Sequence, residues 1–137
     1  MSDLKPELSK KNPYYISKHR RYELVHYCLQ YPIWRDAMNS LSGLAKRPDD
    51  LEVLGREHDI SDPTAKTAMA RAHFAKKMYF VERAAKEADE ELYDWLMLGV
   101  TEGKSYGYLQ THGIPCSETK YYQTYRKFFW ILSRIKD

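Results

Sequence analysis

The segment from Gly113 to Ser117 constrains the fold of this chain more than any other, because it separates two helical patterns with residues that favour a tight turn. Glycine tolerates the left-handed conformation that often ends a helix, and serine can cap the start of the next one. Upstream, Ser105 can open a helix of about two turns that ends at Gly113. The sequence therefore predicts a helix, a tight turn with Ile114 as its apolar plug, and a second helix, which is the order of a helix-turn-helix.

The pattern after Ser117 is that of an amphipathic helix. At about 100° per residue, one side of the helix is apolar and predicts a core face, made of Tyr121, Tyr122, Tyr125, Phe128, Phe129, Leu132 and Ile135. The other side is polar and carries Thr119, Lys120, Gln123, Arg126, Lys127 and Arg134, with Thr124 at its margin. Trp130 and Ile131 interrupt this polar side, and we expect them to pack on another part of the chain.

The polar side has the chemistry that a helix needs in the major groove of DNA. Glutamine can pair with adenine through two hydrogen bonds, while lysine and arginine pair with guanine or with phosphate. The predicted DNA-binding residues are therefore Thr119, Lys120, Gln123, Thr124, Arg126, Lys127 and Arg134. An ordinary surface helix with a solvated polar face fits the same pattern, so the pattern alone leaves both readings open.

Two stretches resemble small phage and prophage regulators of Gram-positive bacteria. They are Asp62-Pro63-Thr64 with the helical pattern behind it, and the run from Gly99 to Leu132. That run resembles the C-terminal helix-turn-helix of the ArpU and RinA types of late-gene activator, which is itself similar to the promoter-reading end of sigma factors. The resemblance covers about residues 61 to 137 and does not extend to the N-terminal part. It implies transcriptional control of phage genes in the cytoplasm of a bacterial host, with a recognition helix that reads double-stranded DNA through Lys120, Gln123, Thr124 and Lys127.

Positive charge is concentrated at both ends of the chain. The net charge is +3, but residues 1–21 hold six Lys or Arg against two acids and residues 117–137 hold five against two, which leaves a net −4 between them. Basic ends suit an anionic partner. We expect residues 1–13 to form a flexible basic arm, and we assign phosphate contacts near the N-terminus to Lys10, Lys11, Lys18, Arg20 and Arg21.

An all-α fold is predicted, with an N-terminal helical hairpin over residues 14–43. Ser17 can cap a helix from Lys18 to about Gln30, and Pro32 is suited to the start of a second helix that ends near Gly43. The second helix should bury a stripe made of Ile33, Trp34, Ala37, Met38 and Leu41, with Trp34 as the anchor. Residues 44–61 contain several helix breakers, among them Pro48 and Gly55, and are predicted to be a linker with one helical turn at Leu51–Leu54.

A long central helix is predicted from Asp62, and residues 62–137 form one part with the helix-turn-helix. No helix breaker stands between Thr64 and Leu98. One apolar seam runs along this helix at spacings of three and four, through Phe74, Met78, Val81, Ala85, Ala88, Leu92 and Trp95. The seam either carries the N-terminal helices or forms a dimer interface, so a monomer and a homodimer both remain open.

Several classes of protein are excluded or disfavoured by what the sequence lacks. Cys28 and Cys116 are 88 positions apart without a metal-ligand spacing, and no catalytic or phosphate-loop motif is present, so we expect neither a metal, a cofactor nor an enzyme. The longest apolar runs are about five residues, too short for a membrane span. Two alternatives to DNA reading remain, a protein-interaction module that contacts RNA polymerase and a DNA-packaging adaptor.

Overall fold

The computed structural model describes residues 12–45 and 61–137, and within these ranges the regular secondary structure is entirely α-helical, which confirms the predicted all-α class. The chain divides into two compact units. One consists of the residues up to Tyr31 together with Phe80–Asp137, and the other of Pro32–Tyr79. The division falls inside the long helix, whereas the sequence had placed residues 62–137 in a single part.

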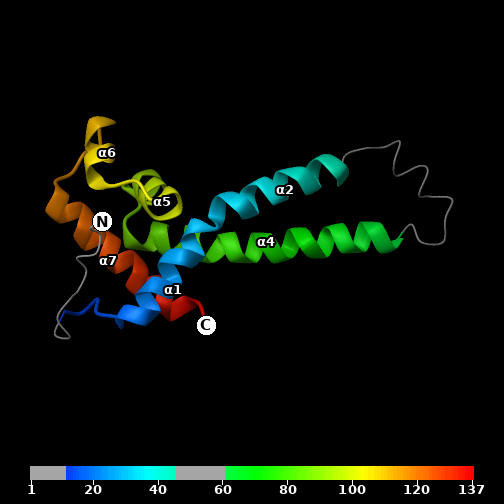
Figure 1. Ribbon diagram of the computed structural model, residues 1–137, viewed down its shortest axis with the longest axis horizontal. Coiled ribbons are helices and arrows are strands. Elements are labelled where there is room, and N and C mark those ends of the chain that lie inside the picture. The colour runs from blue at the N-terminus through cyan, green and yellow to red at the C-terminus, as the bar shows by residue number, and fades with distance from the viewer. Residues whose placement is uncertain (1–11, 46–60) are drawn as a thin grey trace. The chain divides into compact units, whose positions relative to one another are not determined.

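Helix α1 spans Lys18–Leu29 and begins where the sequence predicted (Figure 1). The hydroxyl of Ser17 accepts a hydrogen bond from the backbone N–H of Arg20 at 3.3 Å, which caps the first turn. Only Gln30, with helical backbone angles, separates α1 from α2, Tyr31–Ala45. A helical hairpin is joined by a loop of about 2–5 residues, so the predicted hairpin is not confirmed.

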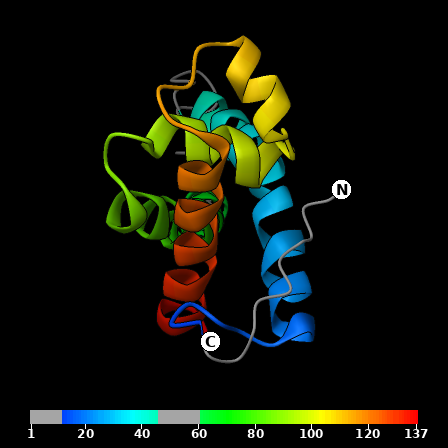
Figure 2. The ribbon, with the colours of Figure 1, turned by 90° about the vertical axis from the view of Figure 1, so that its left-hand side faces the viewer.

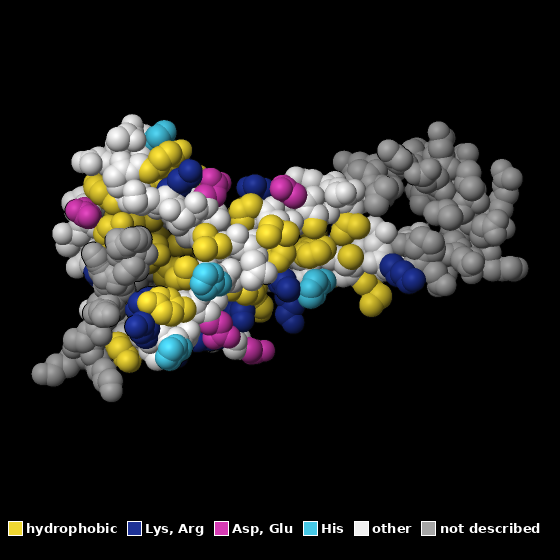
Figure 3. Space-filling model, in the orientation of Figure 1, with side chains coloured by type: hydrophobic (Ala, Val, Ile, Leu, Met, Phe, Trp, Pro, Cys, Tyr) yellow, Lys and Arg dark blue, Asp and Glu magenta, His cyan; other side chains and the backbone are white. Residues whose placement is uncertain are grey.

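In the unit Pro32–Tyr79, α2 and the first part of α4, Ser61–Ala88, contribute the described residues. Trp34 is buried, as predicted, and the Nζ of Lys77 lies 5.4 Å from the centre of its ring. Ile33 belonged to the same predicted stripe but is 65% exposed. Hydrophobic side chains are visible along both helices in Figure 3. Residues 46–60, which include the predicted turn at Leu51–Leu54, lie outside the described residues.

The predicted unbroken helix from Thr64 to Leu98 is wrong, because the chain leaves the helix after Ala88 and resumes as α5, Tyr93–Glu102. The cause is Asp89, whose carboxylate accepts the backbone N–H of Leu92 at 3.1 Å. A short acidic side chain offers the backbone an alternative to the helical hydrogen bond, and here that alternative forms a turn. Leu92, predicted in the helical seam, is buried at this turn instead.

The other unit is built around α1 and α7, Glu118–Ile135, which lie side by side and run in opposite directions (Figure 2). Helix α5 packs against α1 and contacts the short helix α6, Tyr106–Thr111. The largest fully buried side chains come from α1, from the part of α4 after Tyr79, and from α5, α6 and α7. They are Leu24, Cys28, Val81, Leu96, Leu109, Tyr121, Phe128 and Leu132.

The guanidinium of Arg20 in α1 holds the C-terminal end of α7. Its Nε donates to Ser133 Oγ at 3.1 Å, and Nη2 donates to the carbonyls of Ser133 at 3.2 Å and Lys136 at 2.7 Å. Nη1 donates to the Asp137 carbonyl at 3.2 Å and to Glu23 at 2.9 Å. The last carbonyls of a helix lack partners within it, so Arg20 supplies the missing donors.

Replacing Arg20 by alanine should therefore destabilise the protein by roughly 2 kcal/mol, because several hydrogen bonds to a charged and mostly buried group are lost together. Arg21→Ala is the matched control and should change the free energy of unfolding by less than about 0.5 kcal/mol. Urea denaturation of both variants measures the difference. Equal effects of the two substitutions would show that the contacts of Arg20 do not stabilise the fold.

Candidate nucleic-acid interface

The turn between α6 and α7 has the geometry that the sequence predicted. The N–H of Ile114 donates to the Leu109 carbonyl at 3.1 Å, and the N–H of Gly113 donates to the Gln110 carbonyl at 3.1 Å. This pair of bonds defines a Schellman motif, which requires a left-handed residue, and Gly113 has φ +93°. Ile114 is buried and plugs the turn.

Helix α7 starts at a serine cap and is fixed to α6 by Tyr106. Ser117 Oγ accepts the N–H of Lys120 at 3.2 Å, as predicted. The hydroxyl of Tyr106 donates to the Cys116 carbonyl at 2.6 Å, and the ring centres of Tyr106 and Tyr121 are 5.9 Å apart. These contacts join the short helix, the turn and the start of α7 into one helix-turn-helix shaped unit.

The predicted core face of α7 is confirmed. Tyr121, Phe128, Phe129 and Leu132 are buried, and the remaining members, Tyr122, Tyr125 and Ile135, are half-buried. The two apolar residues that interrupted the polar side also pack as expected. Ile131 is buried, and the ring of Trp130 lies 5.6 Å from that of Tyr14, which precedes α1.

Most of the predicted polar side faces outward. Thr119, Lys120 and Gln123 are exposed on the first two turns, and Arg126 and Lys127 are half-buried. Arg134 is exposed at the far end, with its guanidinium 4.9 Å from the centre of the Trp130 ring. At about 1.5 Å per residue, Arg134 lies roughly 21 Å along the helix from Lys120, so the two cannot reach the same bases.

Thr124 does not fit its predicted place in the interface. It is only 4% exposed, and its hydroxyl donates to the Lys120 carbonyl at 3.0 Å. A threonine in a helix can bond in this way to the carbonyl four residues before it, which leaves its hydroxyl with a partner when the side chain turns inward. Thr124 is therefore a packing residue of α7, and its buried side chain is not placed to contact DNA as predicted.

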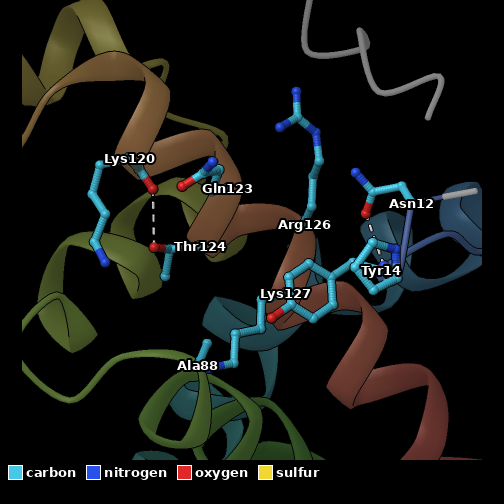
Figure 4. A pocket seen from close by; sticks show the side chains of 9 residues that line it. Asn12, Tyr14, Ala88, Lys120, Gln123, Thr124, Arg126 and Lys127 are labelled. Atoms are coloured by element: carbon cyan, nitrogen blue, oxygen red, sulfur yellow. Dashed lines mark hydrogen bonds between the residues drawn. The ribbon is translucent and has the colours of Figure 1, made fainter. Parts of the chain in front are cut away.

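A hollow of about 410 Å³ lies along the polar side of α7 (Figure 4). Its walls come from three segments that are distant in sequence, and it is lined by Asn12, Pro13, Tyr14, Ala88, Lys120, Gln123, Thr124, Arg126 and Lys127. The residues of α7 were predicted from the sequence, whereas the other two segments were not. No local signal places Asn12–Tyr14 beside α7, because that placement depends on the long-range contact between Tyr14 and Trp130.

Two lysines of the predicted interface extend toward the end of α4. The Nζ of Lys120 lies 3.6 Å from a carboxylate oxygen of Asp89, and the Lys120 side chain remains 55% exposed. Lys127 extends toward Ala88, the last residue of α4 (Figure 4). The C-terminal end of a helix carries the negative pole of the helix dipole. Both lysines therefore lie next to negative potential within the protein.

The residues predicted to contact phosphate near the N-terminus differ in where the structure places them. Lys10 and Lys11 lie outside the described residues. Lys18 and Arg21 are on α1, where their charged ends lie 5.8 Å and 5.3 Å from the centre of the Tyr22 ring. Arg20 is occupied by the end of α7, so its guanidinium has a structural role in place of the predicted phosphate contact.

Within residues 12–45 and 61–137, no group of three or more His, Cys, Asp or Glu residues is arranged to hold a metal ion. Across the same ranges, no helix combines the length and the apolar character that crossing a membrane requires. Comparisons of the chain with protein-family models, with curated proteins and with solved structures give no match.

Proposed function

We propose that this protein binds double-stranded DNA through α6, the turn and α7, and that it regulates transcription of phage or prophage genes. The observation that carries the proposal is the exposure of Thr119, Lys120 and Gln123 on the first two turns of α7. In a helix-turn-helix, the start of the second helix is the part that contacts base edges. The phage context is supported by the resemblance of residues 61–137 to late-gene activators.

Base contacts are assigned to Gln123 and Lys120, and Thr119 lies beside them on the same exposed surface. The Gln123 carboxamide can pair with adenine through two hydrogen bonds, and the Lys120 ammonium can donate to guanine. Lys120 must first leave Asp89, from which it is separated by 3.6 Å. An ion pair with one partner this exposed contributes about 0–1 kcal/mol, so a favourable contact with a base can replace it.

Phosphate contacts are assigned to Arg126 and Lys127, with Arg134 reaching the backbone further along the duplex. Contacts of this kind fix the orientation of the protein and carry no sequence information themselves. Their contribution should appear as a dependence of affinity on salt, because each neutralised phosphate releases counterions.

Gel-shift titration of duplexes from the regions upstream of neighbouring genes, at two salt concentrations, tests the proposal. Lys120→Ala and Gln123→Ala should each weaken binding to the preferred sequence by about 1–3 kcal/mol and binding to random DNA much less. Lys86→Ala, a substitution of an exposed cation on α4, is the control and should leave both affinities unchanged. Equal losses on preferred and random DNA would contradict base reading, and absence of any DNA binding would contradict the proposal.

A second candidate is an interaction module that contacts a protein such as RNA polymerase. The observation that favours it is the exposure of Glu90, Glu91 and Asp94 around the turn between α4 and α5. Pull-down of the polymerase in the absence of DNA distinguishes the two functions. Loss of capture on neutralising these three acids, with capture retained in Lys120→Ala, would favour the interaction module.

A further inference from the structure

The hollow beside α7 gathers hydrogen-bond donors from two separate parts of the chain. Lys120, Arg126 and Lys127 contribute positive charge, and Gln123 and Asn12 contribute carboxamides. Among the described residues that line it, none is acidic. Its volume of about 410 Å³ is sufficient for a small charged group with part of the molecule that carries it.

The wall made by Asn12 and Tyr14 is held by specific contacts. Asn12 Oδ1 accepts the backbone N–H of Tyr14 at 2.8 Å, and the Asn12 carbonyl accepts the N–H of Tyr15 at 3.0 Å. The Tyr14 ring rests 5.6 Å from the ring of Trp130 on α7. Because Oδ1 accepts the bond of this turn, the NH₂ group of Asn12 is the end that can serve a ligand.

The five donors point in two directions (Figure 4). Lys120 and Lys127 extend toward the end of α4, and Lys120 is paired there with Asp89 at 3.6 Å. Arg126 and Asn12 extend away from α4 with their polar ends beside each other in this view, and Gln123 lies between Arg126 and Lys120 along α7. A guanidinium offers two parallel N–H donors that match two oxygens of a phosphate, and the carboxamides can donate to the remaining oxygens.

We propose that Arg126, Gln123 and Asn12 form a binding site for one phosphate group, with the segment before α1 supplying a wall of the site. If that phosphate belongs to DNA, the inference rests on the proposed function: Gln123 then pairs with a base, Arg126 and Asn12 hold the phosphate, and Asn12 is added to the interface. A free phosphorylated small molecule presents the same group. The N-terminal segment and α7 then act as one anion receptor, a role that the sequence had assigned only to separate cations.

The first experiment uses inorganic phosphate and the full chain. Phosphate is titrated at constant ionic strength while the side-chain N–H signals of Asn12, Gln123 and Arg126 are followed by NMR. We expect saturable shifts, weakened at least about tenfold in Arg126→Gln because a charged donor pair is lost. Asn12→Asp keeps the oxygen that accepts the Tyr14 N–H but replaces the donor by a negative charge, so it should weaken phosphate binding about as strongly. Lys86→Gln is the matched control and should leave phosphate binding unchanged.

The second experiment measures how the affinity for duplex DNA depends on salt in the same variants. If the site takes a phosphate of the DNA backbone, Arg126→Gln should make the slope of log K against log salt shallower by about 0.9, while Lys86→Gln leaves it unchanged. Saturable binding of inorganic phosphate together with a slope change assigns the site to the DNA backbone. A slope change alone would leave Arg126 as a single phosphate contact and would overturn the site that it shares with Asn12. Saturable binding of inorganic phosphate with an unchanged slope assigns it to a free phosphorylated ligand.

The two proposals fail separately. Saturable phosphate binding by a protein that binds no DNA would remove the proposed function and leave the phosphate site. Sequence-specific DNA binding with unchanged slopes in Arg126→Gln and Asn12→Asp, together with no saturable phosphate binding, would overturn the phosphate site and leave the proposed function.

Discussion

Replacing Gly99 by alanine should destabilise the protein by about 1–3 kcal/mol, although alanine is the better helix former. Gly99 lies in α5, and a Cβ added there would stand 2.0 Å from the hydroxyl oxygen of Tyr121 and 3.3 Å from the ring carbon that bears it. Tyr121 is 1% exposed, so its side chain has no free space into which it can move. The clash should therefore exceed the gain in helix propensity, as chemical denaturation would measure.

The hydroxyl of Tyr121 is the group that an added Cβ at Gly99 would clash with most severely. It is the one buried side-chain oxygen or nitrogen without a hydrogen-bond partner among the described residues, and burial raises the pKa of this phenol, so it remains neutral. Tyr121→Phe removes an unpaired polar atom and should stabilise the fold by about 1 kcal/mol. In that background Gly99→Ala loses its worst contact, and its effect on the free energy of unfolding should become neutral or favourable. Equal costs of Gly99→Ala in both backgrounds would show that the hydroxyl is not the obstacle.

Replacing Trp34 by alanine should cost roughly 3–5 kcal/mol, because a large side chain that is 3% exposed leaves a cavity when it is truncated. The neighbouring residue on α2 provides a matched control. Ile33 is 65% exposed, so Ile33→Ala should change the free energy of unfolding by less than about 0.5 kcal/mol. A thermal or urea melt of each variant measures the difference.

The same melts, repeated at several protein concentrations, test whether the protein is a monomer or a homodimer. Unfolding midpoints that rise with protein concentration would indicate association of chains. A large cost for Ile33→Ala that appears only at high concentration would place Ile33 in that association surface. A cost at Trp34 below about 0.5 kcal/mol would contradict its role as an anchor.

Features that depend on neighbours in the sequence were predictable. The serine caps at Ser17, Ser105 and Ser117 each accept a backbone N–H three residues later, and the turn at Gly113 is set by residues within five positions. The core face of α7 was also predictable, because the spacing of its aromatic residues follows the helical period. These caps, turns and spacings depend on residues close together in the sequence, so the folded protein retains them.

Features that depend on long-range contacts were not predictable from the same patterns. A single carboxylate at Asp89 ends α4, and nothing in the helical period distinguishes it from the other acids nearby. Thr124 lies at the margin between the polar and apolar sides of α7, and packing in the folded protein decides that its side chain is buried. The placement of Asn12–Tyr14 beside α7 requires Trp130, more than a hundred positions away. For this reason the sequence identified one wall of the hollow and missed the others.

The contact of Arg20 with the end of α7 also sets an order of events during synthesis. Arg20 and Ser133 are 113 positions apart, so at about 5–20 residues per second α1 waits roughly 6–23 s for the carbonyls that it holds. Helices α5 and α7, which both contact α1, emerge after it. During that interval the Cys28 thiol, which is fully buried in the folded protein and has its pKa raised by that burial, is accessible to reagents. Pulse-labelling of this thiol during and after synthesis would therefore report the moment at which α5 and α7 pack against α1.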